Sequence, residues 1–208
     1  MIQEKLNQAL LFAAGIGDAD KVAALIKKGA DVGAFSGTGE QPLHFAAQNG
    51  RREVVDLLIA CGADVNGENH SKRQPLHFVA YNGRGAAVDV MKLLVANGAQ
   101  LDAADVFGQR PLHRAAQNGQ KEMVEILLGC GADPTADDDH HNKPGDLCMW
   151  EIAKVLEEAE RQWKDPLLRK NREQEARKLR EKLAGEAIAE HLLRQRKLGS
   201  LRMKGPSI

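Results

Sequence analysis

Three histidines recur in one local context along the chain: His44, His77 and His113 each follow a Pro-Leu pair and precede a glycine by six residues. Imidazole groups in series could ligate a metal ion or pass protons. However, adjacent helical units pack about 10 Å apart, whereas a zinc ion binds its ligands at about 2 Å. Successive histidines therefore cannot share one ion, and we predict that all three make structural hydrogen bonds.

A second group of potential ligands lies in the segment 137–141, which reads Asp-Asp-Asp-His-His. Carboxylates and imidazoles could hold a divalent ion, but nothing in this spacing imposes a closed coordination shell. We interpret the segment as a solvated loop and predict no metal site. Cys61 and Cys130 stand 69 residues apart at equivalent places in two distant units, so they are beyond the reach of a disulfide.

Residue patterns for catalysis or cofactor binding are weak. The segment Gly37-Thr38-Gly39 is rich in glycine, but no Lys-Ser or Lys-Thr pair follows it, so we expect no phosphate-binding loop. No Ser/His/Asp or Cys/His set has the local context that an activated nucleophile needs. We therefore expect no catalytic residue, no cofactor and no small-molecule substrate, and we predict that the protein is not an enzyme.

The wider pattern around the histidines is a repeat. Prolines at positions 42, 75, 111 and 144 are separated by 33, 36 and 33 residues, and Gly-Ala pairs at 29–30, 62–63, 98–99 and 131–132 keep step with them. Self-similarity at such a period is typical of stacked repeat proteins, whose units are stable only together. The first unit lacks Pro-Leu-His and the last is shortened, as expected for terminal units that have one face in water.

Each unit is predicted to be a helix, a turn, a second helix and a loop. In the second unit, Pro42 suits the first position of a short helix. The next helix carries a stripe of Val, Leu and Ile and ends at Gly62, for which we predict a positive φ, as for Gly98 and Gly131. The third unit has three extra residues around positions 83–87, which we expect to bulge outward.

Pro-Leu-His-x-Ala-Ala, a following glycine, a Val-x-x-Leu-Leu helix and Gly-Ala-Asp together resemble the ankyrin repeat over roughly residues 4 to 160. The resemblance implies an all-α fold: an ankyrin-repeat solenoid of helix-turn-helix repeats with β-turn loops, followed by a C-terminal helix. The expected repeat domain spans residues 1–164 and a basic helical extension spans 165–208. Its repeats are expected at approximately 4–34, 35–67, 68–103 and 104–136, with a cap at 137–164.

The resemblance also implies a binding surface. Members of the family bind proteins through β-turn fingertips and through a palm made of the first helices, and their repeats have no catalytic machinery. By register, the fingertip positions of this chain are Thr38, Glu40, His70, Ser71, Arg73, Val106, Phe107, Gln109 and His140. The palm positions are Gln48, Asn49, Tyr81, Asn82, Gln117 and Asn118. The family usually has Thr before Pro-Leu-His, but this chain has Gln41, Gln74 and Arg110, which are poor N-caps and should cost about 0.5–2 kcal/mol per helix.

Three of these positions carry apolar side chains that the repeat register exposes: Tyr81 on the palm, and Val106 and Phe107 on a fingertip. An exposed ring has no folding reason to be there, so we predict that these side chains anchor a partner. The alternative is that Phe107 folds back onto the neighbouring turn and Tyr81 packs against the insertion that follows it. The helix-packing positions are expected to hold Phe12, Phe45 and Phe78.

Charge divides the chain into an acidic body and a basic tail, since residues 1–160 hold 15 Lys/Arg and 23 Asp/Glu, whereas residues 161–208 hold 14 and 6. Asp165-Pro166 should interrupt the helical pattern, and residues 167–197 read as a charged helix weakened at Gly185. Its narrow apolar stripe consists of Ala176, Leu179, Leu183, Ala187 and Ile188. The last residues, 199–208, are expected to be flexible until something binds them.

The role of the tail stays open between two interpretations. Its cations could dock on an acidic protein surface, on RNA or on an anionic membrane surface, or they could belong to a solvated helix with local ion pairs. The absence of aromatic residues after Trp163 argues against single-strand nucleic-acid recognition. The candidate tail anchors are Arg169, Lys170, Arg177, Lys178, Arg180 and Lys182.

The sequence favours a non-catalytic adaptor or scaffold that binds a protein partner through its repeats, with the basic helix as a second anchor. A rival hypothesis is a structural subunit of a large assembly, which could contain RNA, in which the tail is the main anchor and the repeats are a spacer; the charged tail helix is also a candidate coiled coil. A third is a regulator that occludes the active site of an enzyme. With three cysteines, no signal-like N-terminus and no apolar run of membrane-spanning length, we expect a cytoplasmic protein, or a nuclear or assembly-associated one.

Overall fold

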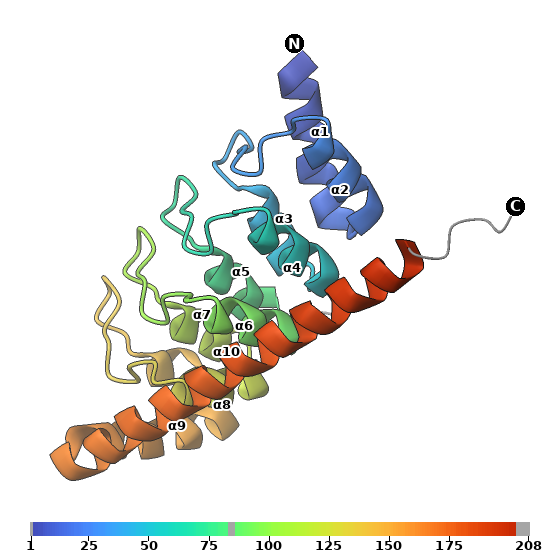
Figure 1. Ribbon diagram of the computed structural model, residues 1–208. Coiled ribbons are helices and arrows are strands. Elements are labelled where there is room, and N and C mark those ends of the chain that lie inside the picture. Colours follow the sequence, from blue (N-terminus) through green and yellow to red (C-terminus); the bar gives the residue numbers. More distant parts are fainter. Residues whose placement is uncertain (1, 83–85, 203–208) are drawn as a thin grey trace, which may run out of the picture.

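The computed structural model describes residues 2–82 and 86–202 (Figure 1). Every regular element in these ranges is helical, and the helices stack side by side in pairs as an elongated array. The expected outward bulge of the third unit falls largely on residues 83–85, which lie outside the described residues, as do residues 203–208 of the tail. No helix in the described ranges is long and apolar enough to cross a membrane.

Each of the first four units contributes one helix pair, and the first helices pack on one another in chain order. The pairs are α1 (Ile2–Ile16) with α2 (Ala19–Lys27), α3 (Pro42–Gln48) with α4 (Arg52–Ala60), α5 (Pro75–Asn82) with α6 (Ala87–Ala96), and α7 (Pro111–Gln117) with α8 (Lys121–Gly129). Between them lies a continuous core of Leu, Val and Ala side chains. The prediction of an all-α repeat solenoid is confirmed.

Small residues and left-handed glycines set the spacing of the array. Ala46 and Ala47 of α3 are fully buried where α3 packs against α1, α4 and α5, and their small side chains let these helices approach closely. Beyond α4, α6 and α8, the φ angles of Gly62, Gly98 and Gly131 are 89°, 86° and 96°. Only glycine adopts this conformation cheaply, so the prediction of positive φ is confirmed at all three.

The fifth unit is shortened, as predicted, and the part that is missing is most of its first helix. A single 3-10 turn, η1 (Pro144–Leu147), replaces it, and α9 (Trp150–Lys164) follows as the second helix. The chain breaks helical conformation at Asp165, as expected for a residue before proline. The Asp165 carboxylate accepts hydrogen bonds from the backbone N–H groups of Leu167 and Leu168, at 2.9 and 3.3 Å, and so caps the next helix.

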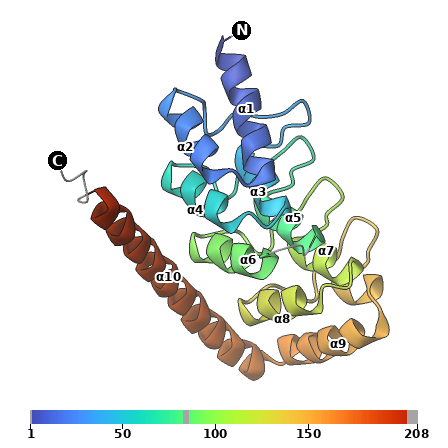
Figure 2. The same ribbon diagram turned by 90° about the vertical axis from the view of Figure 1, so that its right-hand side faces the viewer.

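That next helix, α10 (Pro166–Arg202), folds back along the array and packs against α8 and α6 (Figure 2). Most of the apolar stripe faces inward: Ala176 and Leu183 are only 2% and 8% exposed, whereas Ile188 is 62% exposed. Leu179 and Ala187 pack against the same core. The interpretation of the tail as a solvated appendage is therefore wrong for this stripe, because the protein's own second helices cover it. Gly185 does not interrupt the helix.

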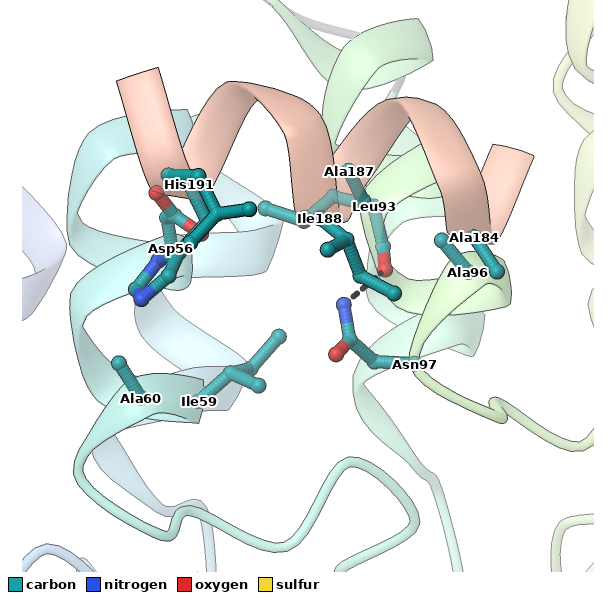
Figure 3. Close-up of a pocket in the computed structure, with 11 residues that line it drawn as sticks. Asp56, Ile59, Ala60, Leu93, Ala96, Asn97, Ala184, Ala187, Ile188 and His191 are labelled. Carbon is teal, nitrogen blue, oxygen red and sulfur yellow. Dashed lines mark hydrogen bonds and ion pairs between the residues drawn. The ribbon is translucent and has the colours of Figure 1, made fainter. Parts of the chain in front are cut away.

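Ionic and polar contacts join α10 to α4 near its far end. Glu190 pairs with Arg52, and His191 Nδ1 lies 4.0 Å from Asp56 Oδ1. Figure 3 shows the groove of about 400 Å³ that α4, α6 and α10 enclose here, with Ile188 facing into it. These contacts place α10 along the second helices, on the side of the array opposite the loops.

Candidate functional site

The face opposite α10 is formed by the first helices α1, α3, α5 and α7 and by four projecting loops, here called the fingers (Figure 1). The fingers span residues 33–41, 66–74, 102–110 and 135–143. Together these elements form what we call the concave face. The fingertip and palm positions expected from the sequence fall on these elements, except that Asn49 and Asn118 directly follow α3 and α7.

One polar residue at the base of each finger holds its turn closed. The Oδ1 atom of Asp105 accepts hydrogen bonds from the backbone N–H groups of Phe107 and Gln109, at 2.9 and 3.0 Å. Asn69 and Asp138 do the same in the neighbouring fingers, and Ser36 does so through its hydroxyl in the first. This set was not predicted from the sequence. The signal was there, since the four residues recur at the 33, 36 and 33 spacing of the prolines.

Hydrogen bonds also link each finger to the next. The backbone N–H groups of His70, Val106 and Asp139 donate to the carbonyl oxygens of Thr38, Ser71 and Phe107, respectively, at 3.0 to 3.2 Å. Neighbouring fingers are thus fixed in register, and their tips form one continuous edge of the concave face.

Three of the expected fingertip positions carry side chains that reach toward the next finger. Glu40 accepts from Asn69 at 2.9 Å, Arg73 Nε donates to Asp105 at 3.1 Å, and Gln109 donates to Asp138 at 3.3 Å. All three are half-buried. Burial by itself raises the pKa of Glu40, but hydrogen bonds from Thr38, Ser36 and Asn69 outweigh it and lower that pKa to about 2. These side chains therefore link neighbouring fingers to one another.

The repeated histidines make structural hydrogen bonds, as predicted, and these bonds connect each helix start to the next finger. The Nδ1 atom of His77 accepts from the Gln74 backbone N–H at 3.1 Å, so the ring proton is on Nε2, which donates to the Gln109 carbonyl at 3.2 Å. His44 and His113 make the equivalent pairs of bonds. Burial lowers the pKa of His77 to about 4 and also lowers the pKa of the other two. All three act as neutral structural bridges and replace part of the capping that a Thr would supply.

The palm positions differ in how much they offer to a partner. Asn49 and Asn118 donate to the carbonyl oxygens of Phe45 and Arg114 in their own helices, and Asn82 donates to that of Gln48. These amides are therefore engaged within the array. By contrast, Tyr81 and Gln117 are exposed, and Gln48 is half-buried beside Tyr81.

The expected exposure of the apolar anchors is confirmed, with Tyr81 and Phe107 each 49% exposed and Val106 44%. The expectation for Phe12 is wrong, because its ring is 64% exposed instead of packed between helices. Phe12 occupies the same position in its repeat as Phe45 and Phe78, which are half-buried. Among the described residues α1 is the first helix of the stack, so this ring has a neighbouring first helix on one side only.

Phe12 belongs to an apolar groove at the N-terminal end of the concave face. The groove encloses about 570 Å³ between α1, α3 and the first finger. Its apolar lining consists of Leu11, Phe12, Ile16, Phe35 and Phe45. Phe35, which was not among the predicted anchors, is 71% exposed. Rings this exposed, gathered in one hollow, are typical of a binding surface.

A second hollow, here called the central pocket, lies where α3, α5 and α7 meet the middle fingers. It encloses about 310 Å³ and is lined by Gln48, Arg73, His77, Phe78, Tyr81 and Arg114. Arg73 Nε and Arg114 Nη2 donate to the same atom, Oδ2 of the buried Asp105, at 3.1 and 2.6 Å. Hydrogen bonds from these guanidinium groups and from Phe107 lower the pKa of Asp105 against the opposing effect of burial.

The remaining sequence candidates lie at the ends of the array. His140 is exposed at the tip of the last finger, next to Asp138, whose carboxylate is buried by its finger contacts. The candidate tail anchors are all exposed on the outer side of α10. Among them, Arg169, Arg177 and Lys182 pair with Glu173, Glu181 and Glu186 one helical turn away. The structure therefore separates the tail cations from the concave face.

Comparison with known proteins agrees with this architecture. A family profile described as ankyrin repeats (three copies) matches residues 2–69 and residues 53–138, which together make up more than half of the chain. No curated protein matches the chain. Ankyrin repeats generally mediate protein–protein interaction and are typically non-catalytic. The repeat register, the paired helices and the matching profile show that this chain belongs to the ankyrin-repeat family.

Proposed function

We propose that the protein is a non-catalytic interaction module that binds a protein partner on its concave face. The observation that carries the proposal is the exposure of Phe12, Phe35 and Tyr81 on that face, at 64%, 71% and 49%. Stacking of the repeats buries none of these rings fully, although burying an aromatic ring is strongly favourable. A partner that covers them would gain this free energy.

The position of α10 supports the same assignment. The stripe of Ala176, Leu179 and Leu183 packs on the second helices, so this part of the tail is not available to a partner. The apolar side chains that α10 leaves exposed lie toward its two ends: Leu167 and Leu168 at the start, and Ile188, Leu192 and Leu193 farther along. Its exposed cations could still add a weak electrostatic contact, but exposed ion pairs contribute only about 0–1 kcal/mol each. The proposal makes the concave face the main binding surface because exposed aromatic rings gather there, and it makes the outer side of α10 a second anchor.

Affinity capture with three forms of the full chain tests the proposal. The first is the unaltered protein, and the second replaces Phe12, Phe35 and Tyr81 with alanine. The third is a matched control, in which the exposed residues Met149, Trp150 and Leu167, away from the concave face, are replaced with alanine. Recovered proteins are quantified by mass spectrometry, and the melting temperature of each form is measured.

The proposal requires a partner that binds the unaltered protein and the control but not the concave variant, which is the form with alanine at Phe12, Phe35 and Tyr81. The three forms should have similar melting temperatures. Partners retained by the concave variant but lost when Arg169, Lys170, Arg177, Lys178, Arg180 and Lys182 are replaced with glutamine would instead support an assembly subunit anchored by its tail.

A further inference from the structure

The charges that line the concave face are unbalanced at the central pocket. Arg73 and Arg114 both face this pocket, and Asp105 is the carboxylate that pairs with them. Asp105 is only 4% exposed. Among the described residues that line the central pocket or the apolar groove, none is acidic. A partner that enters the pocket therefore meets two guanidinium groups and no accessible carboxylate.

Asp105 cannot neutralise both arginines. Its Oδ1 accepts from two backbone N–H groups and its Oδ2 accepts from both guanidinium groups, so its acceptor capacity is used. In addition, Arg114 Nε is buried without a hydrogen-bond partner in the described structure. A buried donor left unsatisfied is costly. One further carboxylate in the pocket would balance the charge and accept from the exposed guanidinium N–H groups that Asp105 does not bind.

The two hollows lie on neighbouring repeats and share α3, since Phe45 lines the groove and Gln48, one turn later, lines the central pocket. First helices pack about 10 Å apart, so the centres of the groove, between α1 and α3, and of the pocket, on α5, are about 15 Å apart. An extended peptide covers this distance with about four or five residues.

Resting on the proposed function, we infer that the partner presents an acidic peptide segment: an apolar side chain in the groove and an Asp or Glu carboxylate in the central pocket, about four or five residues apart. Tyr81, which lines the central pocket with the arginines, contacts the peptide beside its carboxylate. A guanidinium binds a carboxylate through paired, charge-assisted hydrogen bonds. A nucleic acid fits less well, because a chain of phosphates requires a row of cations, and the two arginines of the pocket are the cations that line the two hollows.

A phage-displayed library of random peptides, selected against the full chain, tests the inference. The selected sequences should be enriched in an apolar residue and a carboxylate at the stated separation. A synthetic peptide made from the best sequence should bind about tenfold more weakly when its Glu or Asp is changed to the amide, as measured by fluorescence anisotropy.

Gln48→Glu is the sharpest variant, because it places a carboxylate at the pocket and leaves both arginines intact. This variant should bind the acidic peptide about tenfold more weakly than the unaltered protein does, and it should bind the amide form of the peptide about equally well. Gln174→Glu adds the same charge at an exposed position of α10 and should leave the affinity unchanged. Arg114→Gln is a second variant, which tests the same contact by removing one guanidinium group from the pocket.

The outcomes separate this inference from the proposed function. Selected peptides without carboxylates, or peptides that bind equally to the Gln48→Glu variant, overturn the inference, and the proposed function stands if Tyr81→Ala still abolishes their binding. Peptides indifferent to Tyr81→Ala contradict both. Binding of a single-stranded oligouridylate that Gln48→Glu abolishes, with no acidic peptide selected, also overturns the inference.

Discussion

Gly131 and Ala176, 45 positions apart in sequence, are in contact where α10 crosses the end of α8. A Cβ atom built on Gly131 would lie 3.1 Å from the Cβ atom of Ala176, which is closer than ordinary van der Waals contact. Gly131 therefore does two things: it ends α8 with a positive φ, and it leaves room for the C-terminal helix.

This contact gives a test for the docking of α10. Gly62 has nearly the same φ as Gly131, but no atom lies within 4 Å of the place that a methyl group at Gly62 would occupy. Gly62→Ala should therefore destabilise the protein by about 1 kcal/mol from backbone strain alone. Gly131→Ala should cost more, because α10 must also shift. Urea unfolding measures both, and in a chain that ends at Asp165 the two costs should become equal. A difference that persists without α10 would contradict the docked position.

Removing α10 altogether should weaken the protein without unfolding it. The repeats remain stacked and α9 still covers α8, but the burial of Leu183 and its neighbours is lost, which amounts to about 3 kcal/mol. We expect residues 1–165 to keep a cooperative thermal transition at a lower melting temperature. An unchanged melting temperature would mean that α10 is not docked in solution, and loss of the transition would mean that the repeats need it to fold.

Asp105 and Asp138 close neighbouring fingers in the same way, but replacing each with asparagine should lower stability by different amounts. In its own finger, Asn69 occupies the position that Asp105 and Asp138 occupy in theirs, and it accepts equivalent hydrogen bonds from the backbone. Asp138→Asn should therefore cost little. Asp105→Asn should cost about 3 kcal/mol or more, because it removes the charge that Arg73 and Arg114 share. Equal costs in urea unfolding would show that the arginine contacts contribute nothing to stability.

The buried histidines predict a loss of stability in mild acid. Because the folded-state pKa values of His44, His77 and His113 are lowered, the unfolded chain binds more protons below about pH 6.5, and stability falls as the pH decreases toward about 4. His77 alone accounts for up to about 3 kcal/mol of this loss. Glu40 and Asp105, whose pKa values are also lowered, add a further loss only below about pH 4.5.

Melting temperatures measured between about pH 7 and pH 5 check this prediction. His77→Gln should lower the melting temperature at the neutral end of this range and also reduce its dependence on pH. A melting temperature that stays constant across this range in the unaltered protein would show that the histidines are protonated without cost in the fold.

Sequence periodicity predicted the helix pairs, the left-handed glycines, the shortened fifth unit and the exposure of Tyr81 and Phe107, because each depends on local conformation or on repeat register. It did not predict what covers the stripe at Ala176 and Leu183, since an apolar stripe does not identify its partner. The same limitation explains Phe12: register implies equal burial in every repeat, but among the described residues α1 has a neighbouring first helix on one side only.

The central claim is that a partner contacts the concave face and not the outer side of α10. Photocrosslinking tests it directly, with benzoylphenylalanine placed in the full chain at Tyr81 or, in a second form, at Lys178, which is exposed on α10. After irradiation with a partner recovered by affinity capture, the Tyr81 form should yield a covalent complex and the Lys178 form should not. Crosslinking from Lys178 alone would contradict the claim.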